Sequence, residues 1–176
     1  ALVVTATAPA CARQLYFGAD LSFANQMADC NARYRDSDGQ IKDIYTIFKN
    51  HGANLVRVRL WTGGNKSGYS NLGDVEKTIR AARTRGMQAL LDFHYSDNWA
   101  DGGKQPIPRA WAGITNDAEL AETLYQYTYY VMTTLAHQGL MPQMVQVGNE
   151  INPEMLQYSS VHFVNGGVAE KPKIDW

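Results

Sequence analysis

Short stretches rich in β-branched and aromatic residues alternate with amphipathic segments along most of this chain. The strand-like stretches run over residues 16–21, 55–61, 87–95 and 144–150, and the segments between them carry apolar residues at helical spacing. The last of these segments, residues 117–137, has Asn116 or Asp117 as its N-cap and Gly139 beyond its end. Because strand and helix alternate, the sequence predicts parallel βαβ units and an α/β fold.

The connection between the first two strands divides into two parts. Residues 25–39 are rich in Asn, Asp and Arg, and we expect a polar loop there. Ile41, Ile44, Tyr45 and Phe48 then recur at helical spacing, and Gly52 follows as a helix end. The sequence thus predicts one helix between these strands.

The strands alternate between apolar and polar residues. In residues 55–61 every second residue is Val or Leu, and Arg57, Arg59 and Trp61 lie between them. In a doubly wound sheet helices cover both faces, whereas the strands of a barrel become polar inside, near their carboxyl ends. The pattern favours a barrel over an open sheet and predicts one polar face, formed by Asp20, Arg57, Arg59, Asp92, His94 and Glu150.

The run Val145 to Glu150 is interpreted as a buried strand that delivers a carboxylate at its end. A Glu near Arg or His, with apolar walls, can be tuned into a general acid, and glycoside hydrolysis needs such an acid together with a second carboxylate. Alternatively, the charged residues of the polar face could form a network of ion pairs that only supports the fold. This interpretation applies most to Arg57 and Asp92, because they lie deeper in their strands.

Several classes of partner and cofactor are disfavoured. The chain has 16 basic and 17 acidic residues without long runs of either sign, so it lacks the electrostatic footprint for nucleic acid or an anionic membrane. It contains no P-loop, no dinucleotide fingerprint and no Gly-x-Ser-x-Gly motif. The four histidines lack the spacing of a metal site. We expect a neutral partner, no cofactor and no metal.

The first twelve residues are uncharged and end in Ala10-Cys11-Ala12, the small-x-small pattern of a signal-peptidase site. We expect residues 1–12 to be the remnant of a secretory signal and residues 13–176 to be the domain. The protein is then secreted, extracellular or periplasmic. With Cys11 removed, Cys30 would have no partner, which favours a structural role for it.

Four blocks of sequence resemble family 53 of the glycoside hydrolases, the endo-β-1,4-galactanases that cut the galactan backbone of type I arabinogalactan. They occur in family order over residues 16–152. The blocks are Phe17-Gly-Ala-Asp-Leu-Ser22; Val56-Arg-Val-Arg-Leu-Trp61; Asp92-Phe-His-Tyr-Ser-Asp-Asn-Trp-Ala-Asp101 with Lys104-Gln105 and Pro108 to Trp111; and Val145-Gln-Val-Gly-Asn-Glu-Ile-Asn152.

The resemblance implies a clan A (β/α)8 TIM barrel, a retaining double displacement, and a galactan or arabinogalactan substrate from pectin. It implies that Glu150 is the acid/base, that Asn149 hydrogen-bonds the sugar 2-hydroxyl, and that Arg59 braces the nucleophile near His94. The substrate-binding residues expected from it are Asp20, Arg59, Trp61, His94, Asp97, Trp99, Trp111 and Asn149. Trp99 comes first among the candidate sugar platforms because it lies in a loop.

The chain departs from the family pattern near its end. The family nucleophile is a Glu on the seventh strand, and neither Glu154 nor Glu170 has that strand context, so we expect no nucleophile in this chain. An eight-stranded barrel takes about 250 residues, and only about four β/α units are recognisable here. We interpret the chain as the N-terminal half of the barrel, a fragment without calcium ligands that self-associates in isolation, from a full-length protein that is a monomer.

Two alternatives remain open at this point. The chain could be a non-catalytic, carbohydrate-binding half-barrel, because Trp99 and Trp111 are retained without a nucleophile. It could also derive from a clan A hydrolase that acts on mannan, xylan or cellulose, although the loop from Ser96 to Trp111 argues against that substrate change.

Overall fold

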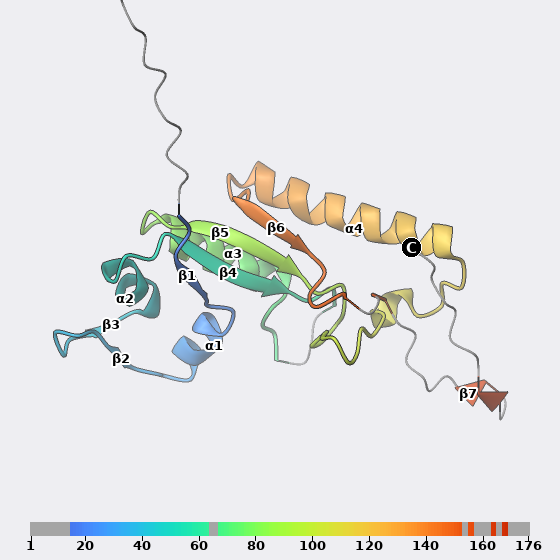
Figure 1. The fold of residues 1–176 in the computed structure, drawn as a ribbon, viewed down its shortest axis with the longest axis horizontal. Coiled ribbons are helices and arrows are strands. Elements are labelled where there is room, and N and C mark those ends of the chain that lie inside the picture. The colour runs from blue at the N-terminus through green and yellow to red at the C-terminus, as the bar shows by residue number, and fades with distance from the viewer. Residues whose placement is uncertain (1–14, 64–66, 153–154, 157–162, 165–166, 169–176) are drawn as a thin grey trace, which may run out of the picture.

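The computed structural model describes residues 15–63, 67–152, 155–156, 163–164 and 167–168 (Figure 1). The expected signal remnant, residues 1–12, lies outside the described residues, as do Glu154 and Glu170. The described elements, in chain order, are β1 (Gly18–Asp20), α1 (Ala24–Asp29), β2 (Tyr34–Arg35), β3 (Ile41–Lys42), α2 (Ile44–Asn50), β4 (Leu55–Leu60), α3 (Leu72–Arg83), β5 (Gln88–Phe93), the 3-10 helix η1 (Arg109–Trp111), α4 (Asp117–His137), β6 (Met144–Val147), β7 (Phe163–Val164) and β8 (Gly167–Val168).

The main sheet has four strands in the order β1-β4-β5-β6, and all neighbouring pairs are parallel. The four strands therefore lie side by side in the same order in which they follow one another along the chain. A doubly wound sheet instead reverses its strand order at a switch point. The described sheet consequently has the topology of a barrel segment, which confirms the expected fold class.

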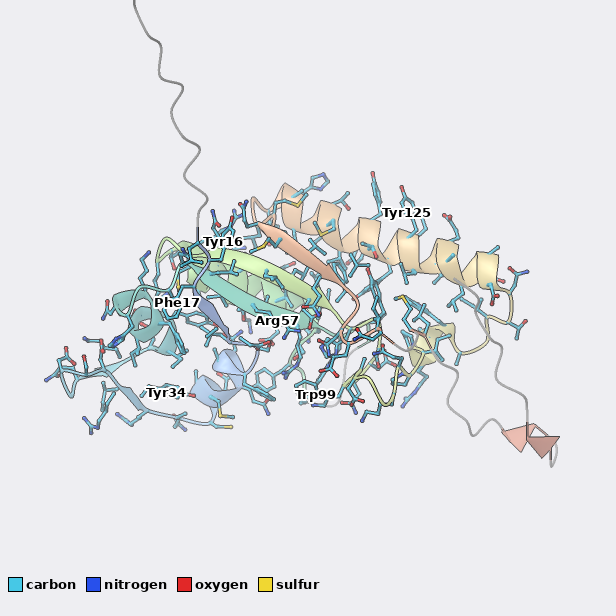
Figure 2. The ribbon with its side chains drawn as sticks, viewed as in Figure 1. Tyr16, Phe17, Tyr34, Arg57, Trp99 and Tyr125 are labelled. Atoms are coloured by element: carbon cyan, nitrogen blue, oxygen red, sulfur yellow. The ribbon has the colours of Figure 1, made fainter. Side chains whose placement is uncertain are left out.

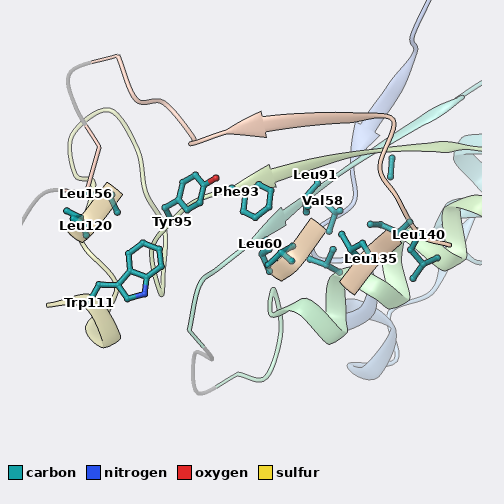
Figure 3. Packing of buried hydrophobic residues seen from close by; sticks show 14 residues of the cluster. Val58, Leu60, Leu91, Phe93, Tyr95, Trp111, Leu120, Leu135, Leu140 and Leu156 are labelled. Carbon is teal, nitrogen blue, oxygen red and sulfur yellow. The ribbon is translucent and has the colours of Figure 1, made fainter. Parts of the chain in front are cut away.

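Helices cover one face of this sheet. Val58, Leu60, Leu91 and Phe93 point from β4 and β5 into a hydrophobic cluster, where they meet apolar side chains of α3 and α4 (Figure 3). These side chains are almost completely buried. The apolar alternation read from the sequence is thus confirmed for both central strands.

Helix α4 has the predicted bounds. Its N-cap is Asn116, whose side chain accepts a hydrogen bond from the Glu119 amide at 3.1 Å. After the helix, Gly139 adopts a φ of +69°, a left-handed conformation that favours glycine. Among the described residues no helix is both long and apolar enough to cross a membrane.

The opposite face of the sheet is polar. The register places Asp20 beside Arg57, Arg59 beside Asp92, and Asp92 beside Gln146. Side chains of directly paired residues point to the same face, so charged groups from neighbouring strands come together there. Figure 2 shows Arg57 on this side of the strands.

The prediction of a polar loop over residues 25–39 is wrong. Residues 24–29 form α1, and residues 34–35 pair with residues 41–42 in an antiparallel hairpin. Ile41, which was assigned to the helical pattern, belongs to β3 and is 46% exposed. The helix α2 begins only after Asp43, whose carboxylate accepts a hydrogen bond from the Thr46 amide. Local side-chain hydrogen bonds organise this segment, and they leave no periodic signal in the sequence.

The interpretation of residues 145–147 as a buried strand is also incorrect. Val145 and Val147 are 37% and 55% exposed. They lie beside Leu91 and Phe93, on the apolar side of the sheet, but β6 is the outermost strand of the described sheet. Because β6 has a neighbouring strand on one side only, the side chains of Val145 and Val147 remain exposed on the other side.

Candidate active site

Arg57 is the centre of the polar face. Its guanidinium forms ion pairs with Asp20 of β1 and with Asp92 of β5, the second at 2.6 Å. It also donates to Asn149 Oδ1 at 2.9 Å and to Gln146 Oε1 at 3.3 Å. One side chain on β4 therefore contacts the other three strands of the main sheet or the residues that follow them.

The carboxylate of Asp20 is held in its ionised form. Burial alone would raise the pKa of Asp20, but hydrogen bonds from Ser22 and from Arg57 outweigh burial and leave this pKa below its usual range. The Ser22 amide donates to Asp20 Oδ1 at 2.9 Å. The Ser22 hydroxyl oxygen accepts a hydrogen bond from the Arg59 amide at 2.9 Å.

His94 is fixed on both sides of its ring. Its Nδ1 accepts a hydrogen bond from the Ala100 amide at 3.2 Å, and its Nε2 lies 3.0 Å from Asp92 Oδ2. Because Nδ1 accepts, the ring proton is on Nε2, which donates to the carboxylate. Asp92 is completely buried, and its Oδ1 has no hydrogen-bond partner in the part of the chain that the structure describes.

Arg59 has different surroundings from Arg57. Its guanidinium carbon lies 4.1 Å from the ring centre of Phe23, 4.3 Å from Trp99 and 4.8 Å from Trp61. Its Nε donates to Ser70 Oγ at 3.0 Å, and within the described ranges it makes no ion pair. Burial lowers the pKa of Arg59, and the charges of Asp20 and Asp74 offset this only partly. This arginine is thus a buried cation packed among aromatic rings.

The predicted sugar platforms differ in exposure. Trp99 is 42% exposed and lies in the loop after β5, against Phe23, Trp61 and His94. Trp61 is buried beneath it. Trp111 is buried in the hydrophobic cluster, where its ring meets Tyr127 edge-on at 5.7 Å. Of these tryptophans, only Trp99 presents a large part of its ring to solvent.

Asn149 and Glu150 follow β6 in an unusual backbone conformation. Gly148 has a φ of +88°, and Glu150 has a φ of +51°, which is uncommon for a residue with a side chain. A Cβ at Gly148 would lie 2.5 Å from Ile151 Cγ2, so the turn requires glycine. The Glu150 carboxylate is exposed and accepts the Gly102 amide at 3.0 Å, whereas Asn149 is buried and donates to the Ala100 carbonyl at 2.8 Å.

Asp97 braces the loop in which it lies. Its Oδ2 accepts the Arg109 amide at 2.8 Å, and its other oxygen lies so close to Gly63 that a Cβ there would collide with it. Within the described ranges Asp97 thus accepts a hydrogen bond from protein backbone, and its buried Oδ1 has no hydrogen-bond partner.

The described residues contain no group of three or more His, Cys, Asp or Glu side chains that could hold a metal ion. Two cavities lie away from the polar face. One, of about 380 Å³, lies among α1, the β2–β3 hairpin and α2, and the other, of about 330 Å³, lies at the amino ends of the strands beside Arg83 and Gln88.

Several contacts of this site were not anticipated from the sequence. They involve Phe23 over Arg59, Ser70 at its Nε, Gln146 at Arg57, and Gly102 and Gln105 around Glu150. The alternation of residues 144–147 could have placed Gln146 on the polar face. No periodic signal indicates the others, because loops and a short helix bring them there.

Comparison with known proteins gives consistent matches. The model of the family described as glycosyl hydrolase family 53 matches residues 16–169. An arabinogalactan endo-beta-1,4-galactanase of Cellvibrio japonicus is 53% identical over 142 residues, which cover 81% of this chain and 38% of that protein. An endo-beta-1,4-galactanase of Bacillus subtilis is 40% identical over 141 residues, covering 76% of this chain and 32% of that protein.

Solved structures match as well. A structure from a study of two fungal beta-1,4-galactanases matches with a TM-score of 0.76 and 34% sequence identity. The match covers 80% of this chain and 42% of that chain. The Ignisphaera aggregans GH53 catalytic domain has a TM-score of 0.73 and 36% identity, covering 79% and 40%. The chain thus spans about two fifths of the length of the proteins it matches.

Proposed function

The chain belongs to glycosyl hydrolase family 53, and on that premise we propose that it contributes the acid/base half of the active site of a secreted endo-β-1,4-galactanase. The observation that carries this proposal is the position of Glu150. Its carboxylate follows β6 at the carboxyl end of the parallel sheet, the end at which barrel enzymes mount their catalytic groups.

The proposed reaction is a retaining double displacement on β-1,4-galactan. Glu150 protonates the glycosidic oxygen as the bond to the anomeric carbon breaks, and a second carboxylate forms a covalent glycosyl intermediate. Glu150 then takes a proton from the water that displaces this intermediate. We propose that the second carboxylate lies outside the described residues.

The surroundings of Arg59 suit a position next to that second carboxylate. It is a cation buried to 3% exposure, with aromatic rings and a hydroxyl around it and no ion pair among the described residues. A buried charge is costly unless it is paired, and a carboxylate that enters beside it would gain a charge-assisted hydrogen bond. We therefore propose that Arg59 braces the nucleophile.

Trp99 and Asn149 support the binding of a neutral sugar. The exposed ring of Trp99 offers an apolar surface on which the C–H face of a galactose ring can stack. The Nδ2 of Asn149 donates one hydrogen bond, to the Ala100 carbonyl, which leaves a second amide proton for a hydroxyl group of the sugar.

A second candidate is a carbohydrate-binding protein without hydrolytic activity. The exposed ring of Trp99 beside an open polar face favours it, since these features suffice for binding. Binding of galactan oligosaccharides without release of reducing ends would decide for this candidate.

The test uses the product of the complete reading frame, assayed on galactan, mannan, xylan and cellulose. We expect release of reducing ends from galactan, and a loss of about 100-fold or more in Glu150→Gln, with oligosaccharide binding retained. Glu122→Gln is the matched control, because Glu122 is exposed on α4 and, within the described residues, accepts one surface hydrogen bond, from Gln126. Full activity of Glu150→Gln would exclude the acid/base role, and hydrolysis of another polysaccharide alone would exclude the substrate.

A further inference from the structure

The loop after β5 holds the end of the neighbouring strand β6. Asp101 and Lys104 exchange backbone hydrogen bonds at 2.8 and 3.0 Å, and the Asp101 carboxylate accepts the Gly103 amide at 2.8 Å. This tight turn directs the Gly102 amide outward, where it donates to Glu150 Oε2 at 3.0 Å. The carboxylate of the proposed acid/base is thus held by a backbone group of another βα unit.

Gln105 connects the same turn to the backbone of β6. It is 2% exposed, and its Nε2 donates to the carbonyl of Asn149 at 2.7 Å, to that of Asp101 at 3.0 Å and to that of Glu150 at 3.3 Å. An amide nitrogen has two protons, so one of them is shared between two carbonyls. Both peptide carbonyls beside the Glu150 Cα therefore depend on one buried side chain.

This contact stabilises a backbone conformation that is otherwise unfavourable. The φ of +51° at Glu150 is unfavourable for a residue with a side chain and persists only where the surroundings impose it. Asn149 is fixed from the same loop, through its donation to the Ala100 carbonyl at 2.8 Å. The loop therefore fixes both the backbone and the carboxylate of Glu150.

We propose that Gln105 is a positioning residue for Glu150: its side-chain amide fixes the left-handed turn that directs the carboxylate toward the glycosidic oxygen. The positioning itself is a property of the described structure, whereas its effect on hydrolysis rests on the proposed function. Gln105 does not touch the sugar in this proposal.

The first experiment does not require activity. Amide hydrogen exchange is measured by NMR in the wild type, in Gln105→Met, which has no donor, and in Gln105→Glu, which replaces the donor with an acceptor. Release of Glu150 should speed exchange of the Gly102 amide by about tenfold, the value of one hydrogen bond. Gln88→Met is the matched control, because Gln88 lies at the opposite end of β5 and should leave this exchange unchanged. Unchanged exchange at Gly102 in both folded Gln105 variants would overturn the proposal.

The second experiment separates positioning from general damage. Cleavage of galactan needs protonation of a poor leaving group, whereas an aryl galactoside with a strongly acidic phenol leaves without it. Gln105→Met should lower kcat on galactan by about 10- to 100-fold and leave the first step on the aryl substrate almost unchanged, with KM similar for both. An equal loss on both substrates would overturn the positioning role. A wild-type protein inactive on every substrate would refute the proposed function, and the exchange measurement would still decide the role of Gln105.

Discussion

The guanidinium of Arg57 lies 2.6 Å from the carboxylate of Asp92, which is completely buried. The arginine itself remains partly exposed and reaches the other strands of the sheet from the centre of the polar face. The pair therefore joins a carboxylate that is removed from water to a guanidinium that still contacts water.

Replacement of Arg57 should leave the buried Asp92 charge without its cation. We expect Arg57→Met to lower the free energy of unfolding by about 2 to 3 kcal/mol, toward the lower end for a broken buried pair because Arg57 is partly exposed. Urea unfolding followed by tryptophan fluorescence measures this. Addition of Asp92→Asn removes the unpaired charge and should restore part of the loss. A double variant less stable than the sum of the two single changes would contradict this explanation.

Trp99 and Trp111 should respond differently to truncation. Trp99→Ala should weaken the binding of galactan oligosaccharides by about fivefold, the value of about 1 kcal/mol of ring stacking, with little change in stability. Trp111→Ala should instead lower the free energy of unfolding by about 3 to 5 kcal/mol, because it empties a site in the core. Titration calorimetry and urea unfolding measure the two effects. If Trp111→Ala folds and weakens oligosaccharide binding while Trp99→Ala does not, the two roles assigned to these tryptophans are wrong.

The stability that Asp36 contributes in the β2–β3 hairpin should depend on pH. The Asp36 carboxylate accepts hydrogen bonds from Lys42, Asn50 and His51, and these hold its pKa far below the usual range. The unfolded pKa of an Asp is about 3.9, so this stabilisation is fully present above about pH 4 and is lost as the pH falls below that value. The Tm difference between wild type and Asp36→Asn should therefore shrink as the pH falls from about 4 to about 2. A difference independent of pH would contradict the prediction.

Tyr69 should ionise late. Its hydroxyl donates to Asp29 Oδ2 at 2.6 Å, and this hydrogen bond raises the pKa of Tyr69 to about 12. The unfolded pKa of Tyr is about 10, so the stabilisation is fully present below about pH 10 and is lost as the pH rises through about 12. The tyrosinate absorbance of wild type minus that of Tyr69→Phe gives the pKa directly. In Asp29→Asn the same difference should titrate closer to pH 10, and an unchanged midpoint would exclude Asp29 as the cause.

The outer strands should make the 176-residue chain associate with itself. Strands β1 and β6 are the edges of the described sheet, and Val147 is 55% exposed on β6. Val147→Lys places a charge at this edge and should shift the chain toward the monomer in light scattering coupled to gel filtration. Gln126→Lys adds the same charge on the exposed face of α4 and serves as the control. A wild-type chain that is monomeric at high concentration would contradict this prediction.

The sequence predicted the parts of the fold that depend on periodic burial. The alternation along residues 55–60 and 88–93 identified the apolar face correctly, and the bounds of α4 agreed because a cap residue and a glycine mark its ends. The same alternation indicated that Arg57 and Asp92 share a face. Periodicity fails where side chains bond locally, as around Asp36, and it cannot show that β6 is an outer strand.

The partners within the polar face could not be predicted. Arg57 and Arg59 have the same residue type and the same orientation in the alternation, but one binds carboxylates and the other packs among rings. The difference arises because Phe23, the residue before α1, and Trp99, in the loop after β5, lie over Arg59 alone. Gln105 stands in a block that carries the family resemblance, but its contacts could not be predicted, since they are made to the backbone that follows a different strand.

The hydrogen bonds from residues 101–105 to the end of β6 also affect where this chain can accept insertions. Barrel enzymes often acquire new specificities by lengthening a loop while the chemistry stays in place. An insertion between Asp101 and Gln105 would instead displace Glu150, because the same few residues hold its backbone and its carboxylate. Among the described residues the tip of the β2–β3 hairpin has no such link to the polar face, since Asp36 binds Asn50 and His51 at the end of α2. Added segments are therefore better accommodated at that hairpin, where the chain can lengthen without moving the proposed proton donor.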